Sequence, residues 1–255
     1  MTDSNRPGFR AALSNRTIQM TLGVFAFAAA ATGAALAMQT GGGVNAGDKA
    51  AIEQIVHDYI LEHPEIIPQA IEKLQSKRME STLEASRSAL ETPYAGAWEG
   101  AAKGDVTIVE FFDYACGYCR ASLADLAKLV SQDSKLKVVY RELPILSEES
   151  SDAAKVSLLA AERGQYMPFH RALYDAGRVT RDTILASAAK VGIGRADAEA
   201  AIASHKYDAE IASNIALAQK LQASGTPTFV IGKQVLNGAV GHEALKKAVA
   251  AARGK

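Results

Sequence analysis

The run VTIVEFF at residues 106–112 is the feature that most limits the folds open to this chain. Its residues are β-branched and aromatic with little alternation, a pattern typical of a strand buried on both faces. Apolar residues at helical spacing follow at 121–130, and a second strand-like run, LKVVYREL, follows at 136–143. This order of strand, helix and strand predicts a βαβ unit whose two strands are parallel.

The remainder of the domain combines a long helical stretch with two late strands. Residues 149–222 carry Ala-rich helical patterns without a convincing strand, and TFVIG and QVLNG within 228–238 are typical of two short strands. HEALKKAVAAA then predicts a closing helix at 242–252. These elements predict an α/β domain over 93–255 with a mixed sheet and an inserted helical subdomain.

Residues 49–92 carry a different pattern, with apolar residues three and four positions apart. Pro64 ends the first predicted helix, and Pro68 suits the first turn of a second one. Two such helices are too small to bury their own apolar faces. We therefore expect a homo-oligomer that forms through residues 49–90, with docking on the same chain or a spacer stalk as the alternatives.

The first 38 residues predict an export signal. An uncharged run at 17–38 follows three positively charged residues, and Ala35-Leu36-Ala37 offers the small-x-small pattern of a cleavage site. The run is long enough either to be removed near Ala37 or to stay as a membrane anchor at about 18–38. A Gly-rich linker follows at 39–48. Both fates place the remainder outside the cytoplasm, where disulfides persist, and we infer a bacterial periplasm.

The charge balance excludes one class of partner. The chain has 28 Lys and Arg residues against 28 Asp and Glu residues, and no run of five or six like charges occurs. Such a chain has no electrostatic attraction for nucleic acid or for an anionic membrane surface. We therefore expect no nucleic-acid partner.

The chain has two cysteines, Cys116 and Cys119, and they lie between the first strand and the predicted helix. The first sulfur would then lie beside the unsatisfied N–H groups at the positive end of the helix. The dipole is worth roughly 1 to 2 kcal/mol, which would bring a thiol pKa of about 8.5 close to neutrality. We predict that Cys116 is the nucleophile and that Cys119, one turn later, resolves the mixed disulfide.

A zinc site or a static disulfide would also account for a pair of cysteines at this spacing. Zinc takes about four ligands, commonly a second CxxC or two spaced histidines, and the five histidines of this chain are scattered singly. A static bridge across so short a loop would constrain the unfolded chain very little. We therefore expect a redox-active pair, with no metal site within one chain and no cofactor.

The cysteine pair and its flanking segments resemble a known family. VTIVEFFDYACGYCR, followed by a helical block and then by GTPTFVIG, resembles the DsbA-like branch of the thioredoxin superfamily. IVHDYILEHPEIIPQAIEKL is similar to the N-terminal segment of ScsC-like, or suppressor-of-copper-sensitivity, proteins. The resemblance covers about residues 50–252. It implies a thioredoxin fold with an inserted helical subdomain, preceded by an N-terminal helical segment, and a thiol–disulfide oxidoreductase activity.

The resemblance also implies a loop opposite the active site. Thr226-Pro227 would form this loop with a cis peptide bond and would present backbone groups to an extended substrate segment. The loop would also keep metals away from the cysteine pair. Gly117 and Tyr118, between the cysteines, complete the expected substrate-binding residues. The alternative for Pro227 is an ordinary turn proline before a strand.

Glu110 lies six residues before Cys116, where this family often has a carboxylate beneath the active site. A buried carboxylate with a raised pKa can exchange a proton with a thiol of similar pKa. We therefore predict that Glu110 accepts the proton of Cys119. The alternative is a glutamate at the end of a strand, in contact with water.

The direction of the exchange is less constrained by the residues. Gly117 and Tyr118 carry no charge, and a cation there would favour a strongly oxidising pair. A threonine before the cis-proline, here Thr226, resembles the isomerase and reductase members of the family more than the dedicated oxidases. We predict isomerase or reductase work on exported proteins with thiols or disulfides, with a membrane redox partner. The alternatives are a primary dithiol oxidase and a copper-sequestering protein in which neighbouring chains hold Cu(I) between cysteine pairs.

Overall fold

The computed structural model describes residues 46–254, which fall into two compact units that divide after Ala70. The predicted signal or anchor at 1–38 lies outside these residues. The predicted linker at 39–48 ends too late, because helix α2 (Ala46–Glu62) already begins at Ala46. Asp48 lies in the first turn of α2, where the positive end of the helix dipole stabilises a carboxylate. None of the helices in the described range is both long and apolar enough to span a membrane.

The first unit consists of α2 and the start of helix α3 (Ile66–Glu91), which are separated at Pro64 as predicted. Its apolar side chains are unusually exposed, and Ile55 and Leu61 each expose 67% of their surface. The exposed large apolar residues of this unit are Ile52, Ile55, Val56, Tyr59, Leu61 and Ile67. The unit therefore leaves an apolar surface without a cover among its own residues.

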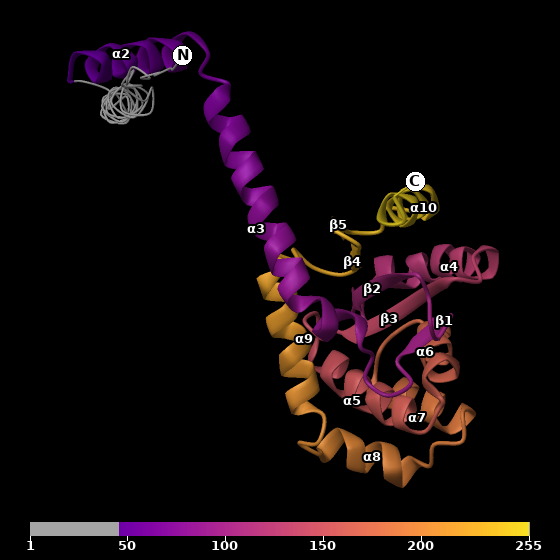
Figure 1. The fold of residues 1–255 in the computed structure, drawn as a ribbon. Coiled ribbons are helices and arrows are strands. Elements are labelled where there is room, and N and C mark those ends of the chain that lie inside the picture. The colour runs from indigo at the N-terminus through magenta and orange to yellow at the C-terminus, as the bar shows by residue number, and fades with distance from the viewer. Residues whose placement is uncertain (1–45, 255) are drawn as a thin grey trace, which may run out of the picture. The chain divides into compact units, whose positions relative to one another are not determined.

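A five-stranded mixed sheet forms the centre of the second unit (Figure 1). Its strands are β1 (Trp98–Gly100), β2 (Val106–Phe112), β3 (Leu136–Glu142), β4 (Thr228–Ile231) and β5 (Gln234–Asn237). They lie in the order β1-β3-β2-β4-β5. β2 and β3 are parallel, as the βαβ pattern predicts, and the other pairs are antiparallel. The sequence did not predict β1, which has only three residues.

Helices account for the rest of the second unit (Figure 1). Helix α4 (Gly117–Gln132) connects β2 to β3, and helix α10 (His242–Ala252) ends the chain. Five helices lie between β3 and β4: α5 (Glu148–Glu162), α6 (Tyr166–Asp175), α7 (Arg181–Lys190), α8 (Arg195–Ala203) and α9 (Asp208–Lys220). The predicted α/β fold with an inserted helical subdomain is confirmed.

Both faces of β2 are buried, as its apolar pattern predicts. Ile108 and Phe112 belong to a core that includes residues of α4, α5, α6 and α10. Val109 and Phe111 belong to a second core, which includes Leu83 of α3 and residues of α9. The later part of α3 therefore packs on the sheet of its own chain.

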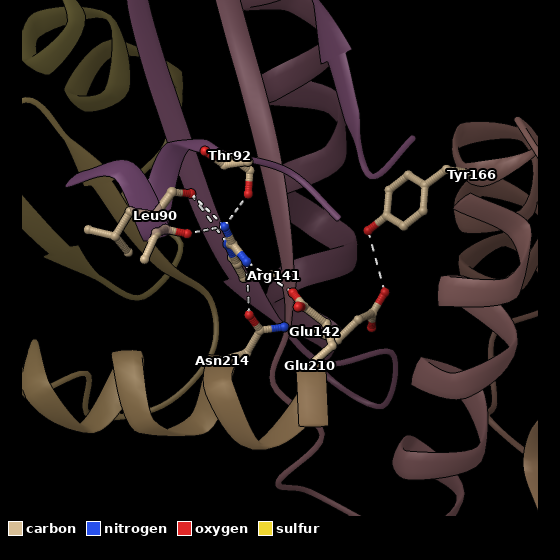
Figure 2. Close-up of polar contacts among 8 residues, drawn as sticks. Leu90, Thr92, Arg141, Glu142, Tyr166, Glu210 and Asn214 are labelled. Atoms are coloured by element: carbon tan, nitrogen blue, oxygen red, sulfur yellow. Dashed lines mark hydrogen bonds and ion pairs between the residues drawn. The ribbon is translucent and has the colours of Figure 1, made fainter. Parts of the chain in front are cut away.

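A buried arginine holds the end of α3 in place (Figure 2). The Arg141 side chain is 5% exposed and donates a 3.0 Å hydrogen bond to the Glu210 carboxylate. It also donates to the Asn214 amide oxygen and to the carbonyl oxygens of Ala89, Leu90 and Thr92. The last carbonyl groups of a helix have no partner within the helix. Arg141 supplies these partners and thereby connects β3, α3 and α9.

Candidate active site

Cys116 lies at the N-cap of α4, directly after β2. Its sulfur accepts a hydrogen bond from the backbone N–H of Cys119 at 3.2 Å. The same thiol donates to the carbonyl oxygen of Thr226, 3.3 Å away. The Cys116 sulfur is therefore placed between the positive end of α4 and the loop that precedes β4.

Cys119 lies one turn further along α4 and is 1% exposed. Both cysteines are free thiols in this structure. Burial raises the pKa of the Cys119 thiol far above its ordinary value, and the nearby Glu110 carboxylate raises it further. A thiol of this kind stays protonated at neutral pH unless another group accepts its proton.

Glu110 lies within β2 and is 1% exposed. Burial raises its pKa well above the usual value, and the charges of Cys116 and Glu99 act in the same direction. The alternative of a solvated glutamate at a strand end does not agree with this position. A buried carboxylate with a raised pKa is a stronger base than a solvated one, and this is the property that the predicted proton acceptor requires once the group is ionised.

The Thr226-Pro227 peptide bond is cis. This loop precedes β4, which is the antiparallel neighbour of β2. Gly117 and Tyr118 are both exposed beside Cys116, and the Tyr118 side chain exposes 71% of its surface. Two of the expected substrate-binding residues are therefore exposed beside the buried Cys116 thiol, although the roles of all four stay predictions.

Asp113 is a buried residue near the site that the sequence reasoning did not single out. Its carboxylate accepts hydrogen bonds from the backbone N–H groups of Ala115, Ile145 and Leu146 at 2.8, 2.8 and 2.9 Å. The Ser150 hydroxyl donates to it at 2.7 Å. The Asp113 carbonyl also accepts from the Cys116 N–H. An acidic residue three positions before the first cysteine was the available signal.

A second feature that sequence reasoning missed is a buried histidine beneath the site. The ring of His170 lies within 5.5 Å of five aromatic rings, those of Phe112, Tyr114, Tyr140, Tyr166 and Tyr174. Burial lowers its pKa to about 3, and Arg171 contributes in the same direction. His170 is therefore neutral and hydrogen-bonded to the Tyr114 hydroxyl at 3.0 Å. Within residues 46–254, no group of three or more His, Cys, Asp or Glu side chains is arranged to hold a metal ion.

Comparison with known families agrees with this geometry. Residues 107–250, more than half of the chain, match the model of the DSBA-like thioredoxin domain. The chain belongs to the DSBA-like thioredoxin family. Residues 48–80 match a second model, the N-terminal domain of the copper resistance protein ScsC. Both parts of the resemblance predicted from the sequence are confirmed.

Three solved structures illustrate the similarity. A thioredoxin-like oxidoreductase from Silicibacter pomeroyi is 40% identical, with 66% of this chain and 98% of that chain covered and a TM-score of 0.63. The thiol-disulfide exchange protein alpha-DsbA2 from Wolbachia pipientis is 28% identical, with coverages of 70% and 97% and a TM-score of 0.62. Proteus mirabilis ScsC in a transitional conformation is 25% identical, with coverages of 82% and 96% and a TM-score of 0.62.

The curated relatives are longer proteins. The Na(+)/H(+) antiporter NhaA 1 of Salinispora arenicola is 26% identical over 156 residues, which are 60% of this chain and 24% of that protein. NhaA 3 of Salinispora tropica is matched over the same shares at 27% identity. The chain therefore spans about a quarter of the length of the curated relatives that it matches. Its DSBA-like family is that of a thiol–disulfide oxidoreductase.

Proposed function

We propose that this DSBA-like chain exchanges disulfides with exported proteins in the periplasm through Cys116 and Cys119. The position of the Cys116 sulfur is the main support for this proposal. The sulfur accepts a hydrogen bond from the Cys119 N–H at the start of α4 and lies 3.3 Å from the carbonyl oxygen of Thr226. A thiolate is stabilised at such a helix start, and the neighbouring Tyr118 side chain is exposed to solvent.

The exchange proceeds in two steps. The Cys116 thiolate attacks one sulfur of a substrate disulfide, so that a mixed disulfide forms and the other substrate sulfur leaves with the electron pair. Cys119 then transfers its proton to the ionised carboxylate of Glu110 and attacks the Cys116 sulfur, which releases the second substrate sulfur as a thiolate. The pair ends as a disulfide and the substrate has gained two electrons. The reverse sequence oxidises a substrate dithiol.

Two further residues support the exchange. The buried Glu110 side chain, in its carboxylate form, provides a proton acceptor for a thiol whose pKa burial raises far above the ordinary range. The backbone of Thr226 binds an extended substrate segment beside Cys116, in the manner of an added strand. In this arrangement Gly117 and Tyr118 contact the substrate on the other side of the reacting sulfur.

The direction that we propose is isomerisation or reduction. Gly117 and Tyr118 supply no cation that would stabilise the reduced pair, and so the pair is a milder oxidant than one that has such a charge. Reduction consumes the dithiol in every cycle. A membrane redox partner is therefore needed to return electrons to the Cys116–Cys119 disulfide.

We further propose that the chain forms a homo-oligomer through residues 49–90. Support comes from the exposed apolar side chains of the first unit, including Ile55 and Leu61, which cost free energy in water. An oligomer places several active sites in one particle, which suits an isomerase that must break and re-form bonds in a misbridged substrate. The periplasmic location rests on the charged and apolar pattern of residues 1–38.

Refolding of a scrambled substrate tests this proposal. The protein is incubated with a misbridged ribonuclease in a glutathione redox buffer, and recovery of ribonuclease activity is followed. We expect recovery above the buffer alone, and its loss in the Cys116→Ser variant. Recovery only from reduced ribonuclease would identify a primary oxidase instead. No effect on either form would contradict the proposed function.

A further inference from the structure

The residue directly after the cysteine pair is an exposed arginine whose side chain reaches the helical subdomain. The backbone N–H of Arg120 donates to the carbonyl oxygen of Cys116 at 3.2 Å, one turn back along α4. Its guanidinium group donates to the carbonyl oxygen of Gly177, 3.0 Å away, in the loop between α6 and α7. Residues four apart in a helix share one face, and their side chains lean toward its N-terminus. The Arg120 charge therefore lies on the same side of α4 as the Cys116 side chain.

This charge has no carboxylate partner in the described part of the chain. Ten arginines lie within residues 46–254, and seven of them form an ion pair with a carboxylate. The three without such a pair are Arg78, Arg120 and Arg178. Arg178 is exposed and directly follows Gly177. Two of the three unpaired arginines thus belong to the place where α4 meets the loop between α6 and α7.

An unpaired cation is unfavourable at the start of a helix. This end of the helix dipole is positive, so a positive charge there raises the free energy of the free protein. The first turn of α4 has no acidic residue that would offset the charge. Asp175, the carboxylate closest to Gly177 along the chain, forms no ion pair with any residue from 46 to 254. An anion bound beside the cysteine pair would remove this unfavourable energy.

We propose that Arg120 and Arg178 bind the carboxylate of an Asp or Glu residue that flanks the reacting cysteine of the substrate polypeptide. This inference rests on the proposed function and names the substrate class of the same site. The occupant follows from position, because the residues next to a sulfur bonded to Cys116 lie within reach of a side chain one helical turn away. A guanidinium group has several N–H donors, and the bond to Gly177 leaves the others for both oxygens of a carboxylate.

The expected effect is a preference for negative charge beside the substrate cysteine. An exposed ion pair is worth up to about 5-fold in an equilibrium constant, and paired arginine–carboxylate bonds are the stronger ones. We therefore expect a cysteine flanked by Asp to react about 5-fold faster than one flanked by Asn at about 10 mM salt. At about 1 M salt the Debye length falls to about 3 Å, and the preference should disappear.

The test compares three disulfide-linked peptides that differ in one residue beside the cysteine, which is Asp, Asn or Lys. The second-order rate constant is measured for attack by the reduced protein, and we expect the order Asp, Asn, Lys from fastest to slowest. Arg120→Gln combined with Arg178→Gln should make the three rates equal. Arg120→Glu combined with Arg178→Glu should reverse the order. Each ratio is taken within one variant, so any effect of the substitution on the reactivity of Cys116 cancels.

Arg195→Gln is the matched control, because it removes the same charge from an exposed arginine of α8, which lies away from α4 (Figure 1). This variant should keep the wild-type order. Every variant also reacts with bis(2-hydroxyethyl) disulfide, which carries no charge. Equal rates for the Asp and Lys peptides in the wild-type protein, or an unchanged order in either double variant, would overturn the carboxylate site and leave the proposed function standing. A wild-type protein that attacks neither the peptides nor the uncharged disulfide would contradict the proposed function itself.

Discussion

Replacing Glu110 by glutamine tests the chemical role assigned to the buried acid. Glutamine keeps the shape of the side chain, and Glu110 is 1% exposed, so the surrounding packing should be preserved. The amide cannot accept a proton. Cys119 would then have to lose its proton without a neighbouring base, although burial still raises its pKa above the ordinary value.

The expected magnitude follows from general base catalysis, which typically contributes 10²- to 10⁴-fold. We therefore expect attack of Cys119 on the mixed disulfide to slow by at least about 100-fold at pH 7. In the wild-type protein this rate should rise with pH as the raised pKa of Glu110 is passed and the carboxylate forms. In Glu110→Gln that rise should be absent.

The same substitution should slow the resolving step but stabilise the fold. Burial raises the folded-state pKa of Glu110 above its ordinary value of 4.5. Between pH 4.5 and the raised pKa, the folded state therefore binds more protons than the unfolded state. The free energy of unfolding therefore falls as pH rises from 4.5 towards the raised pKa. Glu110→Gln should remove this loss and be more stable than the wild-type protein at neutral pH.

Stopped-flow mixing with excess of an aromatic disulfide measures the rate. The first release of coloured thiol depends on reagent concentration and reports attack by Cys116, whereas the second is independent of it and reports attack by Cys119. The control is Glu99→Gln, which removes a charge that raises the pKa of Glu110. In this control the rise of the second-phase rate with pH should remain but should occur at lower pH. An unchanged second phase in Glu110→Gln would refute the role of the carboxyl group.

Three further predictions concern stability and assembly. Arg141→Ala should lower the free energy of unfolding in urea by about 3 to 5 kcal/mol, because it leaves buried acceptors of α3 and α9 without a donor, whereas the exposed Arg163→Ala should cost less than about 1 kcal/mol. Equal effects would contradict the assigned role. His170 should make the fold acid-sensitive: its folded pKa of about 3 lies below the ordinary 6.5, so stability falls as pH falls through that window, and His170→Phe should flatten the slope. Ile55→Asp with Leu61→Asp should reduce the particle mass measured by light scattering, and an unchanged mass would exclude this surface from the oligomer.

Local pattern explains which parts of the fold could be predicted. β2 was predictable because each of its faces is apolar. Pro64 marks the end of α2, and Pro68 lies in the first turn of α3. The cysteine pair was predictable because a strand directly precedes it and a helix follows. Only β1 was missed, since three residues that end in Gly100 carry too little pattern to distinguish a strand from a turn.

The polar supports of the site could not be predicted, because their partners are distant in the sequence. Asp113 accepts hydrogen bonds from Ile145 and Leu146, more than 30 positions away, and Arg141 contacts residues about 50 and 70 positions away. Helical spacing places Tyr166 and Tyr174 beside His170, but Phe112, Tyr114 and Tyr140 come from distant parts of the chain. Such contacts depend on the tertiary fold and not on local spacing.

Trapping the mixed disulfide tests the central claim most directly. The Cys119→Ser variant is incubated with a misbridged exported protein, and the covalent adduct is mapped by mass spectrometry after proteolysis. Our account predicts a substrate cysteine bonded to Cys116 and no adduct in the Cys116→Ser variant. Absence of an adduct in Cys119→Ser, or an equal yield in Cys116→Ser, would contradict it.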